Sequence, residues 1–118
     1  MSLKPSLKYT VATDAARTEQ LLTLKGKLMG SPECYEMLDE TRERTQDGLP
    51  IIILDMTAVD MINSAGAGIL AAMVTSARRQ EGKVCLVGLN DRCRQVLEFM
   101  HLHEFTCIRD TLDEARAD

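Results

Sequence analysis

The stretch that decides the fold is Asp55-Met56-Thr57-Ala58-Val59-Asp60-Met61-Ile62-Asn63-Ser64-Ala65-Gly66-Ala67-Gly68. It follows the apolar run Ile51-Ile52-Ile53-Leu54, which is typical of a central strand covered on both faces. Apolar residues with helical spacing come after it, at Ile69, Leu70, Met73, Val74 and Ala77. We therefore expect a strand that ends at Asp55, a loop that crosses the surface, and a helix of residues 64–80 with a hydroxyl, Ser64, at its beginning.

A hydroxyl at the beginning of a helix has two interpretations. As an N-cap, the Ser64 oxygen would accept a backbone N–H of the first turn, which stabilises a helix by about 1 kcal/mol relative to Ala. As a phosphorylation site, Ser64 would gain about −1.5 to −2 charges at the positive end of the helix, where N–H groups can solvate them. The domain would then keep its fold, while a partner docked over the bare hydroxyl would meet new charge and bulk.

The length and composition predict one globular domain, 1–118. Apolar residues make up 45% of the 118, which is enough for a core without disulfides. The four cysteines, Cys34, Cys85, Cys93 and Cys107, form no Cys-x-x-Cys pair, and buried thiols in a reducing cytoplasm are the simpler interpretation. The N-terminus lacks the apolar run of a signal peptide.

The charge pattern argues against binding to nucleic acid or to a membrane. Fourteen Lys and Arg stand against 18 Asp and Glu, for a net charge of −4, and the positive residues are scattered along the chain. Aromatic residues are 3% of the chain and Trp is absent, so a platform for stacking nucleobases is not expected. The apolar runs are far shorter than the ~20 residues that span a membrane.

The whole chain predicts an α/β fold with the element order β-β-α-β-α-β-α-β-α. Strands are expected at residues 8–12, 19–26, 51–55, 83–88 and 105–108, and the first two are close enough to form a hairpin. Helices are expected at residues 32–46 and 64–80. A third helix is expected after Asn90-Asp91, with Cys93, Val96, Leu97 and Met100 facing inward, and a fourth is expected to begin at Thr111. The hairpin must be antiparallel and the strand–helix–strand units parallel, so the sheet is mixed, with helices packed against it.

This order and the motif after the third strand resemble the STAS domain, and within it the bacterial anti-sigma factor antagonists. Members have a strand that ends in Asp, and then Asp-Ser-Ser/Thr/Ala-Gly-Leu-Gly opening a helix. Asp55 and Asn63-Ser64-Ala65-Gly66-Ala67-Gly68 match these features, with Asn63 in place of Asp and Ala67 in place of Leu. The segments Leu24-Lys25-Gly26-Lys27-Leu28 and Val84-Cys85-Leu86-Val87-Gly88, the latter followed by Asn90, also resemble family segments, so the likeness covers about residues 7–117.

The resemblance implies a bacterial, cytoplasmic regulator of transcription that works by partner switching, and neither an enzyme nor a protein that needs a cofactor. Unphosphorylated, it would bind a serine kinase that is itself the anti-sigma factor. That kinase would phosphorylate Ser64 and end the binding, and a serine phosphatase would restore it. The residues implied for partner binding are Asp55, Asp60, Ile62, Asn63, Ser64, Ala65, Gly66, Ala67 and Gly68. The sequence leaves the oligomeric state open.

Other interpretations of these residues remain. The small residues Gly66 and Gly68 and their neighbouring alanines indicate either close packing of the helix on the sheet or a flat docking surface. Asp55 and Asp60 are better explained as solvated loop carboxylates than as a metal or acid–base pair, and His101 and His103 lack the further ligands that a metal needs.

Two other classes of protein fit parts of the pattern. One is a STAS subunit that is not phosphorylated and docks on a transporter ATPase or another regulatory complex, which Asn63 mildly favours. The other is a phosphoaspartate receiver, which the length and Asp55 fit. A receiver, however, alternates strand and helix from its start, and it needs an acidic pair and a Lys that this chain lacks. We expect no labelling by acetyl phosphate.

Overall fold

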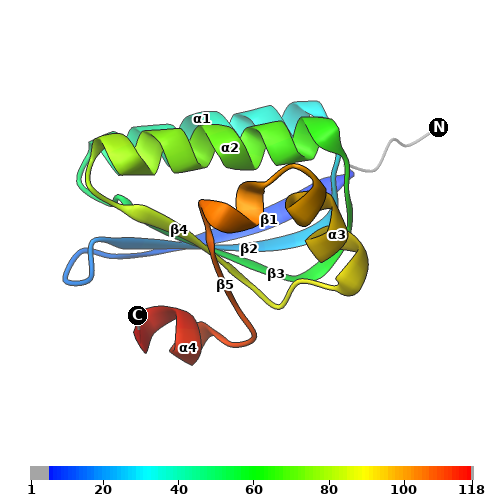
Figure 1. Cartoon of the computed structure of the whole chain (residues 1–118). Coiled ribbons are helices and arrows are strands. Elements are labelled where there is room, and N and C mark those ends of the chain that lie inside the picture. The colour runs from blue at the N-terminus through cyan, green and yellow to red at the C-terminus, as the bar shows by residue number, and fades with distance from the viewer. Residues whose placement is uncertain (1–5, 118) are drawn as a thin grey trace.

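Five strands form one mixed sheet in chain order, as Figure 1 shows for this computed structural model, which describes residues 6–117. The ends of the predicted 1–118 domain, residues 1–5 and 118, lie outside the described residues. The strands are β1 (Leu7–Asp14), β2 (Glu19–Leu28), β3 (Ile51–Ile62), β4 (Lys83–Val87) and β5 (Cys107–Arg109). β1 and β2 are antiparallel and the other neighbours are parallel, which confirms the predicted mixed sheet and disagrees with a receiver fold.

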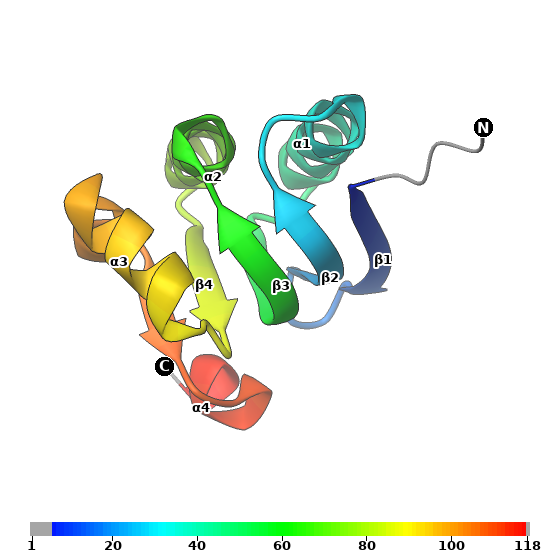
Figure 2. The same ribbon diagram turned by 90° about the vertical axis from the view of Figure 1, so that its right-hand side faces the viewer.

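The helices cover the two faces of the sheet unequally. They are α1 (Pro32–Gln46), α2 (Ser64–Arg79), α3 (Asp91–Phe99) and α4 (Leu112–Ala117), with a short 3-10 helix, η1 (Leu102–Glu104). α1 and α2 lie side by side over one face with α3 beside them, and α4 lies on the opposite face (Figure 2). No helix in the described part of the chain is long and apolar enough to cross a membrane.

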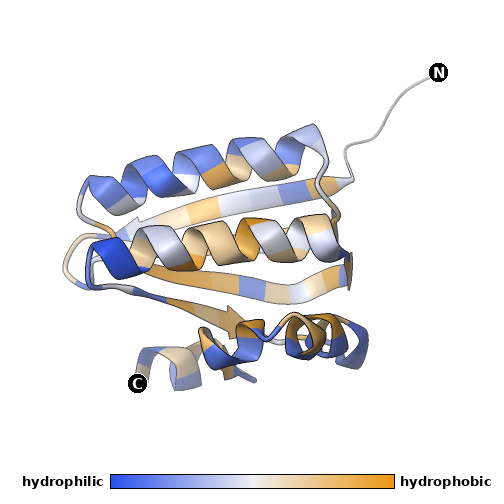
Figure 3. Ribbon diagram, turned by 45° about the horizontal axis from the view of Figure 1, so that its top comes forward, coloured by the Kyte–Doolittle hydropathy of each residue, from blue (hydrophilic) through white to orange (hydrophobic). Residues whose placement is uncertain are grey.

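Two apolar clusters hold these layers together. The larger one lies between the sheet and α1, α2 and α3, and the smaller one lies under α4 with Ile53, Cys85, Val87 and Ala115. Because β4 and the first half of β3 are covered on both faces, they are the most continuously hydrophobic segments, while the outer side of α1 is hydrophilic (Figure 3). Cys34, Cys85 and Cys93 are buried, as expected, whereas Cys107 is only half-buried.

β3 is longer than the sequence indicated. We expected a loop after Asp55, but the strand continues to Ile62 and pairs with β2 as far as Leu28. The pairing shifts register twice, which places the buried side chains of Met56, Val59 and Ile62 three residues apart. These irregularities hide the two-residue alternation of a strand, which is why the segment resembled a loop. The extension carries Ser64 well beyond the end of β4.

The segment after α3 also differs from the expectation. Cys93 and Leu97 are buried, but Met100 follows the end of α3 and is 40% exposed, so its predicted inward position is wrong. The backbone of His101 has a left-handed φ of 58°, which turns the chain into η1. The last strand therefore begins at Cys107 rather than at residue 105, and Phe105 stays exposed.

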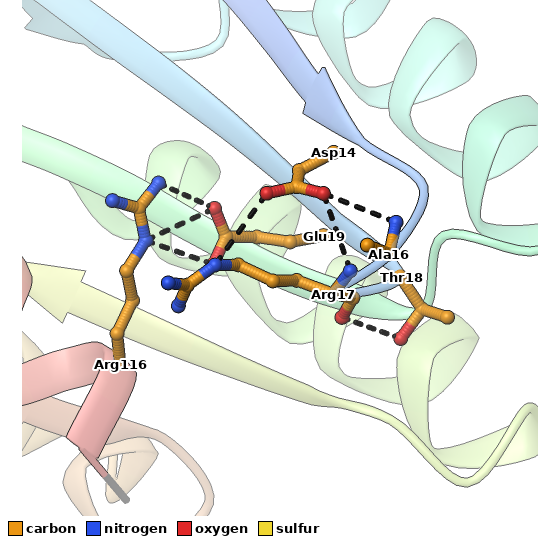
Figure 4. A network of polar contacts seen from close by, with 6 residues as sticks. All are labelled: Asp14, Ala16, Arg17, Thr18, Glu19 and Arg116. Atoms are coloured by element: carbon orange, nitrogen blue, oxygen red, sulfur yellow. Dashed lines mark hydrogen bonds and ion pairs between the residues drawn. The ribbon is translucent and has the colours of Figure 1, made fainter.

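α4 is fastened to the sheet by one ion pair. The Arg116 guanidinium donates to Glu19 on β2, with Nη2 2.7 Å from Oε2 and Nε 3.1 Å from Oε1, and the Glu19 side chain is only 4% exposed (Figure 4). In the adjoining hairpin turn, Asp14 accepts from the backbone N–H groups of Ala16 and Arg17. The bidentate pair compensates for burying the Glu19 carboxylate and fixes the chain's last helix to its second strand.

Tyr9 on the edge strand gives the fold a specific pH dependence. Its hydroxyl donates to Glu40 at 2.9 Å, and burial, this bond and the Glu40 charge raise the pKa of Tyr9 from 10.0 to about 12. Between these values only the unfolded chain loses the Tyr9 proton, so the free energy of unfolding falls as the pH rises through this window. We expect Tyr9→Phe to remove this part of the decline in denaturant unfolding at a series of pH values. Equal declines in both proteins would contradict the assignment.

Candidate functional site

The helix α2 begins with a cap that Asn63 provides. Asn63 Oδ1 accepts the backbone N–H of Gly66 at 2.9 Å, and its Nδ2 donates to the Met29 carbonyl at 3.2 Å. The expectation that Ser64 is the N-cap is therefore wrong. Asn is as good a capping residue as Ser, and Asn63 comes one residue earlier, where the backbone is still extended.

Ser64 is the first residue of α2 and is exposed. Within residues 6–117 its hydroxyl makes no hydrogen bond, since the cap has already been supplied by Asn63. The hydroxyl thus stands at the positive end of a 16-residue helix with no structural task of its own. This is a geometry in which an added phosphate would disturb no existing bond.

Two substitutions at Asn63 test the cap and the effect of an added charge separately. We expect Asn63→Ala to lower the free energy of unfolding by about 1–2 kcal/mol, because the Gly66 N–H loses its acceptor. Asn63→Asp keeps the acceptor and adds a charge that the helix dipole favours, so we expect a change within about 0.5 kcal/mol. Urea unfolding of the three proteins measures both values. If Asn63→Asp were as destabilising as Asn63→Ala, the bond to Met29 would matter more than the cap.

Exposed apolar side chains gather around Ser64. Five large apolar side chains of the described residues are exposed: Met29 37%, Tyr35 49%, Phe99 82%, Met100 40% and Phe105 48%. Met29 is bonded to Asn63 through its carbonyl, and a Cβ added at Gly30 would lie 2.8 Å from the Ala65 methyl carbon and 3.7 Å from the Tyr35 hydroxyl. Phe99 and Met100 lie on the other side of Ser64, in a hollow that Ser64 itself lines. Phe99 and Met100 therefore share a hollow with Ser64, and Met29 and Tyr35 belong to the segment that contacts its neighbours Asn63 and Ala65.

The hollow beside Ser64 separates the beginning of α2 from α3. Its volume is about 410 Å³, and its lining residues are Asn63, Ser64, Arg92, Gln95, Val96, Phe99 and Met100. Asn90 fixes the far wall, because its Oδ1 accepts the Cys93 N–H at 2.7 Å while its Nδ2 donates to the carbonyls of Val59 and Asp60. One side chain thus joins the end of β3 to the beginning of α3 and sets the width of the hollow.

The structure separates the implied partner-binding residues by exposure. Asp60, Ser64 and Gly68 are exposed, Asn63 and Ala65 are half-buried, and Ile62, Gly66 and Ala67 are buried. The buried three pack inside the domain, whereas the exposed and half-buried members are open to a partner, so a contact with a partner stays a prediction for the set. The open surface at Ser64 continues one helical turn along α2 to Gly68, whose surroundings hold no atom within 4 Å of an added Cβ.

Asp55 does not join this surface. It lies inside β3, where its Oδ1 accepts the Thr57 N–H at 3.0 Å, and not at the start of a loop. Six residues of strand, 56–61, separate Asp55 from Ile62 at the end of β3, a distance of about 20 Å along the strand. The expected position of Asp55 beside Ser64 is therefore wrong. Asp55 lies at the point in β3 where pairing with β4 ends. In residues 6–117 no group of three or more His, Cys, Asp or Glu side chains is placed to hold a metal.

Sequence reasoning missed the side chains that share the hollow with Ser64, among them Arg92, Phe99 and Met100. One signal was available for Phe99. The chain has few aromatic residues, and Phe99 falls outside the buried positions Cys93 and Leu97 of α3. A large aromatic side chain on the solvent side of a helix is a recognised sign of a contact surface.

Comparison with known proteins agrees with the architecture. The family model described as STAS domain matches residues 14–115. An anti-sigma factor antagonist from Mycobacterium paratuberculosis superposes with a TM-score of 0.79 at 20% identity, over 99% of this chain and 97% of that one. SpoIIAA, an anti-sigma factor antagonist, superposes in its unphosphorylated form with a TM-score of 0.79 at 16% identity, over 92% of both chains.

Two further solved structures share the fold. SpoIIAA of Bacillus in its phosphorylated form has a TM-score of 0.65 at 18% identity, over 92% of this chain and 96% of that one. A sulfate transporter family protein from Wolinella succinogenes has a TM-score of 0.67 at 19% identity, over 82% and 80% of the two chains. The family match spans most of the sequence. The chain belongs to the STAS domain family.

Proposed function

We propose that this protein is a cytoplasmic anti-sigma factor antagonist that switches partners through Ser64. With a bare hydroxyl it binds a serine kinase that is also the anti-sigma factor, and so frees the regulator that the kinase held. Phosphorylation of Ser64 by that kinase ends the binding, and a serine phosphatase restores it. In this role the protein is a substrate and a ligand, and it uses no cofactor of its own.

The observation that carries this proposal is the position of Ser64 amid exposed apolar side chains. Phe99 and Met100 are exposed and line the same hollow as Ser64, and the exposed Met29 is joined through its carbonyl to Asn63, the residue before Ser64. Interfaces between proteins are enriched in aromatic residues and Met at their centres. The names of the structural relatives support the same role, since several are anti-sigma factor antagonists and one was solved in a phosphorylated form.

The local geometry explains how one phosphate would end binding without unfolding the domain. The hydroxyl makes no hydrogen bond among the described residues, and Asn63 holds the cap, so the added group breaks nothing in α2. A phosphate carries about −1.5 to −2 charges, which must be desolvated if an apolar partner covers it. Loss of affinity would come from this desolvation and from steric bulk.

The test is intact-mass spectrometry of the protein from its native cells, with and without phosphatase treatment. We expect a fraction heavier by one phosphate group, which disappears on treatment and is absent in Ser64→Ala. Ser76→Ala, on the same helix but away from its beginning, is the matched control and should keep the heavier fraction. No heavier fraction under several growth and stress conditions would overturn the proposal.

A second candidate is a docking subunit that is never phosphorylated. The Wolinella structure belongs to a sulfate transporter family protein, and this chain has Asn63 where phosphorylated relatives are expected to have Asp. In that case the surface around Ser64 would bind a transporter ATPase or another complex constitutively. Capture from cell extract separates the two, because a static subunit would retain its partner in Ser64→Ala and wild type alike, whatever the kinase activity.

A further inference from the structure

Arg92 lines the same hollow as Ser64 and belongs to the neighbouring helix α3. It is the second residue of α3, is exposed, and lines the same 410 Å³ space as Ser64. Among the described residues that line the hollow, Arg92 alone carries a charge. No ion pair or hydrogen bond engages its guanidinium within residues 6–117, so it is available to a new anion.

We propose that Arg92 binds the phosphate of phosphorylated Ser64, bridging α3 and α2 across the hollow; this rests on Ser64 being the modified residue. A guanidinium presents parallel N–H donors that match two phosphate oxygens, which makes such pairs the strong form of a charge-assisted hydrogen bond. The hollow is formed by surfaces that are already fixed, through Asn63 on α2 and Asn90 on α3. Only two side chains need to become ordered for the bridge to form.

The bridge adds a second way in which phosphorylation would prevent docking. Val96, Phe99 and Met100 line the same hollow as Ser64 and Arg92. A guanidinium drawn toward the phosphate would cover these apolar side chains, so that a partner's side chain could not enter. Phosphorylation would then remove the apolar contact as well as adding charge.

Other charges near the hollow act on the same phosphate. Asp60 at the end of β3 and Asp91 beside Arg92 are exposed and repel it, whereas the positive end of α2 attracts it. Arg94 lies on the same helix as Arg92 but does not line the hollow. Arg94→Ala therefore removes an equal charge from α3 while leaving the proposed bridge intact, which makes it the matched control.

The experiment is a phosphorus NMR titration of the full chain with phosphoserine installed at position 64 during translation. A nearby cation favours the doubly charged phosphate and lowers its second pKa, which is about 6 in free phosphoserine. We expect Arg92→Ala to raise this pKa by about half a pH unit, Arg92→Lys to raise it by less, and Arg94→Ala to leave it within about 0.1 unit. Urea unfolding of each variant confirms that the exposed substitution leaves the fold intact.

Equal shifts in Arg92→Ala and Arg94→Ala, or no shift in either, would overturn the bridge. Because the phosphoserine is installed without a kinase, this result is independent of whether the chain is phosphorylated in its cells. If Arg92→Ala leaves the phosphoserine pKa unchanged while the native protein has a heavier fraction, the Arg92 bridge is wrong and the proposed function stands. If Arg92→Ala raises the phosphoserine pKa but the native protein is never phosphorylated, the bridge stands and the proposed function is wrong.

Discussion

Gly66→Ala is expected to destabilise the protein more than any other substitution that adds one methyl group to α2. A Cβ at position 66 would lie 1.9 Å from the Leu28 carbonyl oxygen and 2.8 Å from its carbon, both of which are backbone atoms of β2. Alanine favours a helix over glycine by about 1 kcal/mol, but the clash requires α2 to move away from the sheet across a buried interface. We expect a net loss of about 3 kcal/mol or more in the free energy of unfolding.

Gly68→Ala is the matched control for this substitution. It is the same change in the same helix, and the added Cβ has no atom within 4 Å. Only the helix preference remains, so we expect Gly68→Ala to raise the free energy of unfolding by about 0.5–1 kcal/mol. Urea unfolding followed by circular dichroism measures both. If the two variants had similar midpoints, α2 would not approach β2 as closely as the structure places it.

This pair also resolves what the small residues of the motif do. The sequence allowed either close packing or a flat docking surface for Gly66 and Gly68. The structure assigns packing to Gly66, which lies against Leu28, and open surface to Gly68, which lies one turn from Ser64. Periodicity alone could not divide the two roles, because they depend on the β2 backbone, which lies about forty residues earlier in the chain.

The parts of the fold that were predicted correctly are those with a regular pattern. Continuous apolar runs marked the first half of β3 and β4, and helical spacing marked α2. The prediction failed where pairing shifts register, after Asp55, because a bulge changes which side chains face inward without leaving a regular period. It failed again at the end of α3, where a left-handed His101 ends the helix without a glycine.

The site was predicted only as far as it is continuous in sequence. Ser64 and Asn63 stand together in the motif, although their roles at the cap were exchanged. Tyr35 and Phe99 reach the same surface from α1 and α3, helices whose positions depend on tertiary packing. Nothing local to either residue indicates that it lies near Ser64. The motif therefore predicts the position of the Ser64 hydroxyl, whereas the exposed apolar side chains are brought to it only by tertiary packing.

Phe99→Ala is expected to weaken binding of the kinase partner by about 30-fold or more, or roughly 2 kcal/mol, without loss of stability. Phe99 is 82% exposed, so its removal takes little from the core. Buried aromatic side chains contribute most at the centres of interfaces, and Phe99 lines the hollow that Ser64 borders. Titration calorimetry with the partner captured by Ser64→Ala measures the affinity, and urea unfolding measures the stability.

Phe105→Ala is the control that shows whether the loss of binding is specific to the surface around Ser64. Phe105 is also an exposed aromatic, at 48%, but it lies against Arg78 and Leu102 at another hollow, which Ser64 does not line. A general loss of apolar surface would weaken binding in both variants, whereas the proposed interface would be weakened only by Phe99→Ala. Equal affinities for wild type and Phe99→Ala would mean that the partner approaches Ser64 from the Met29 and Tyr35 side, leaving the hollow uncovered. Tyr35→Ala would then be the variant that loses binding.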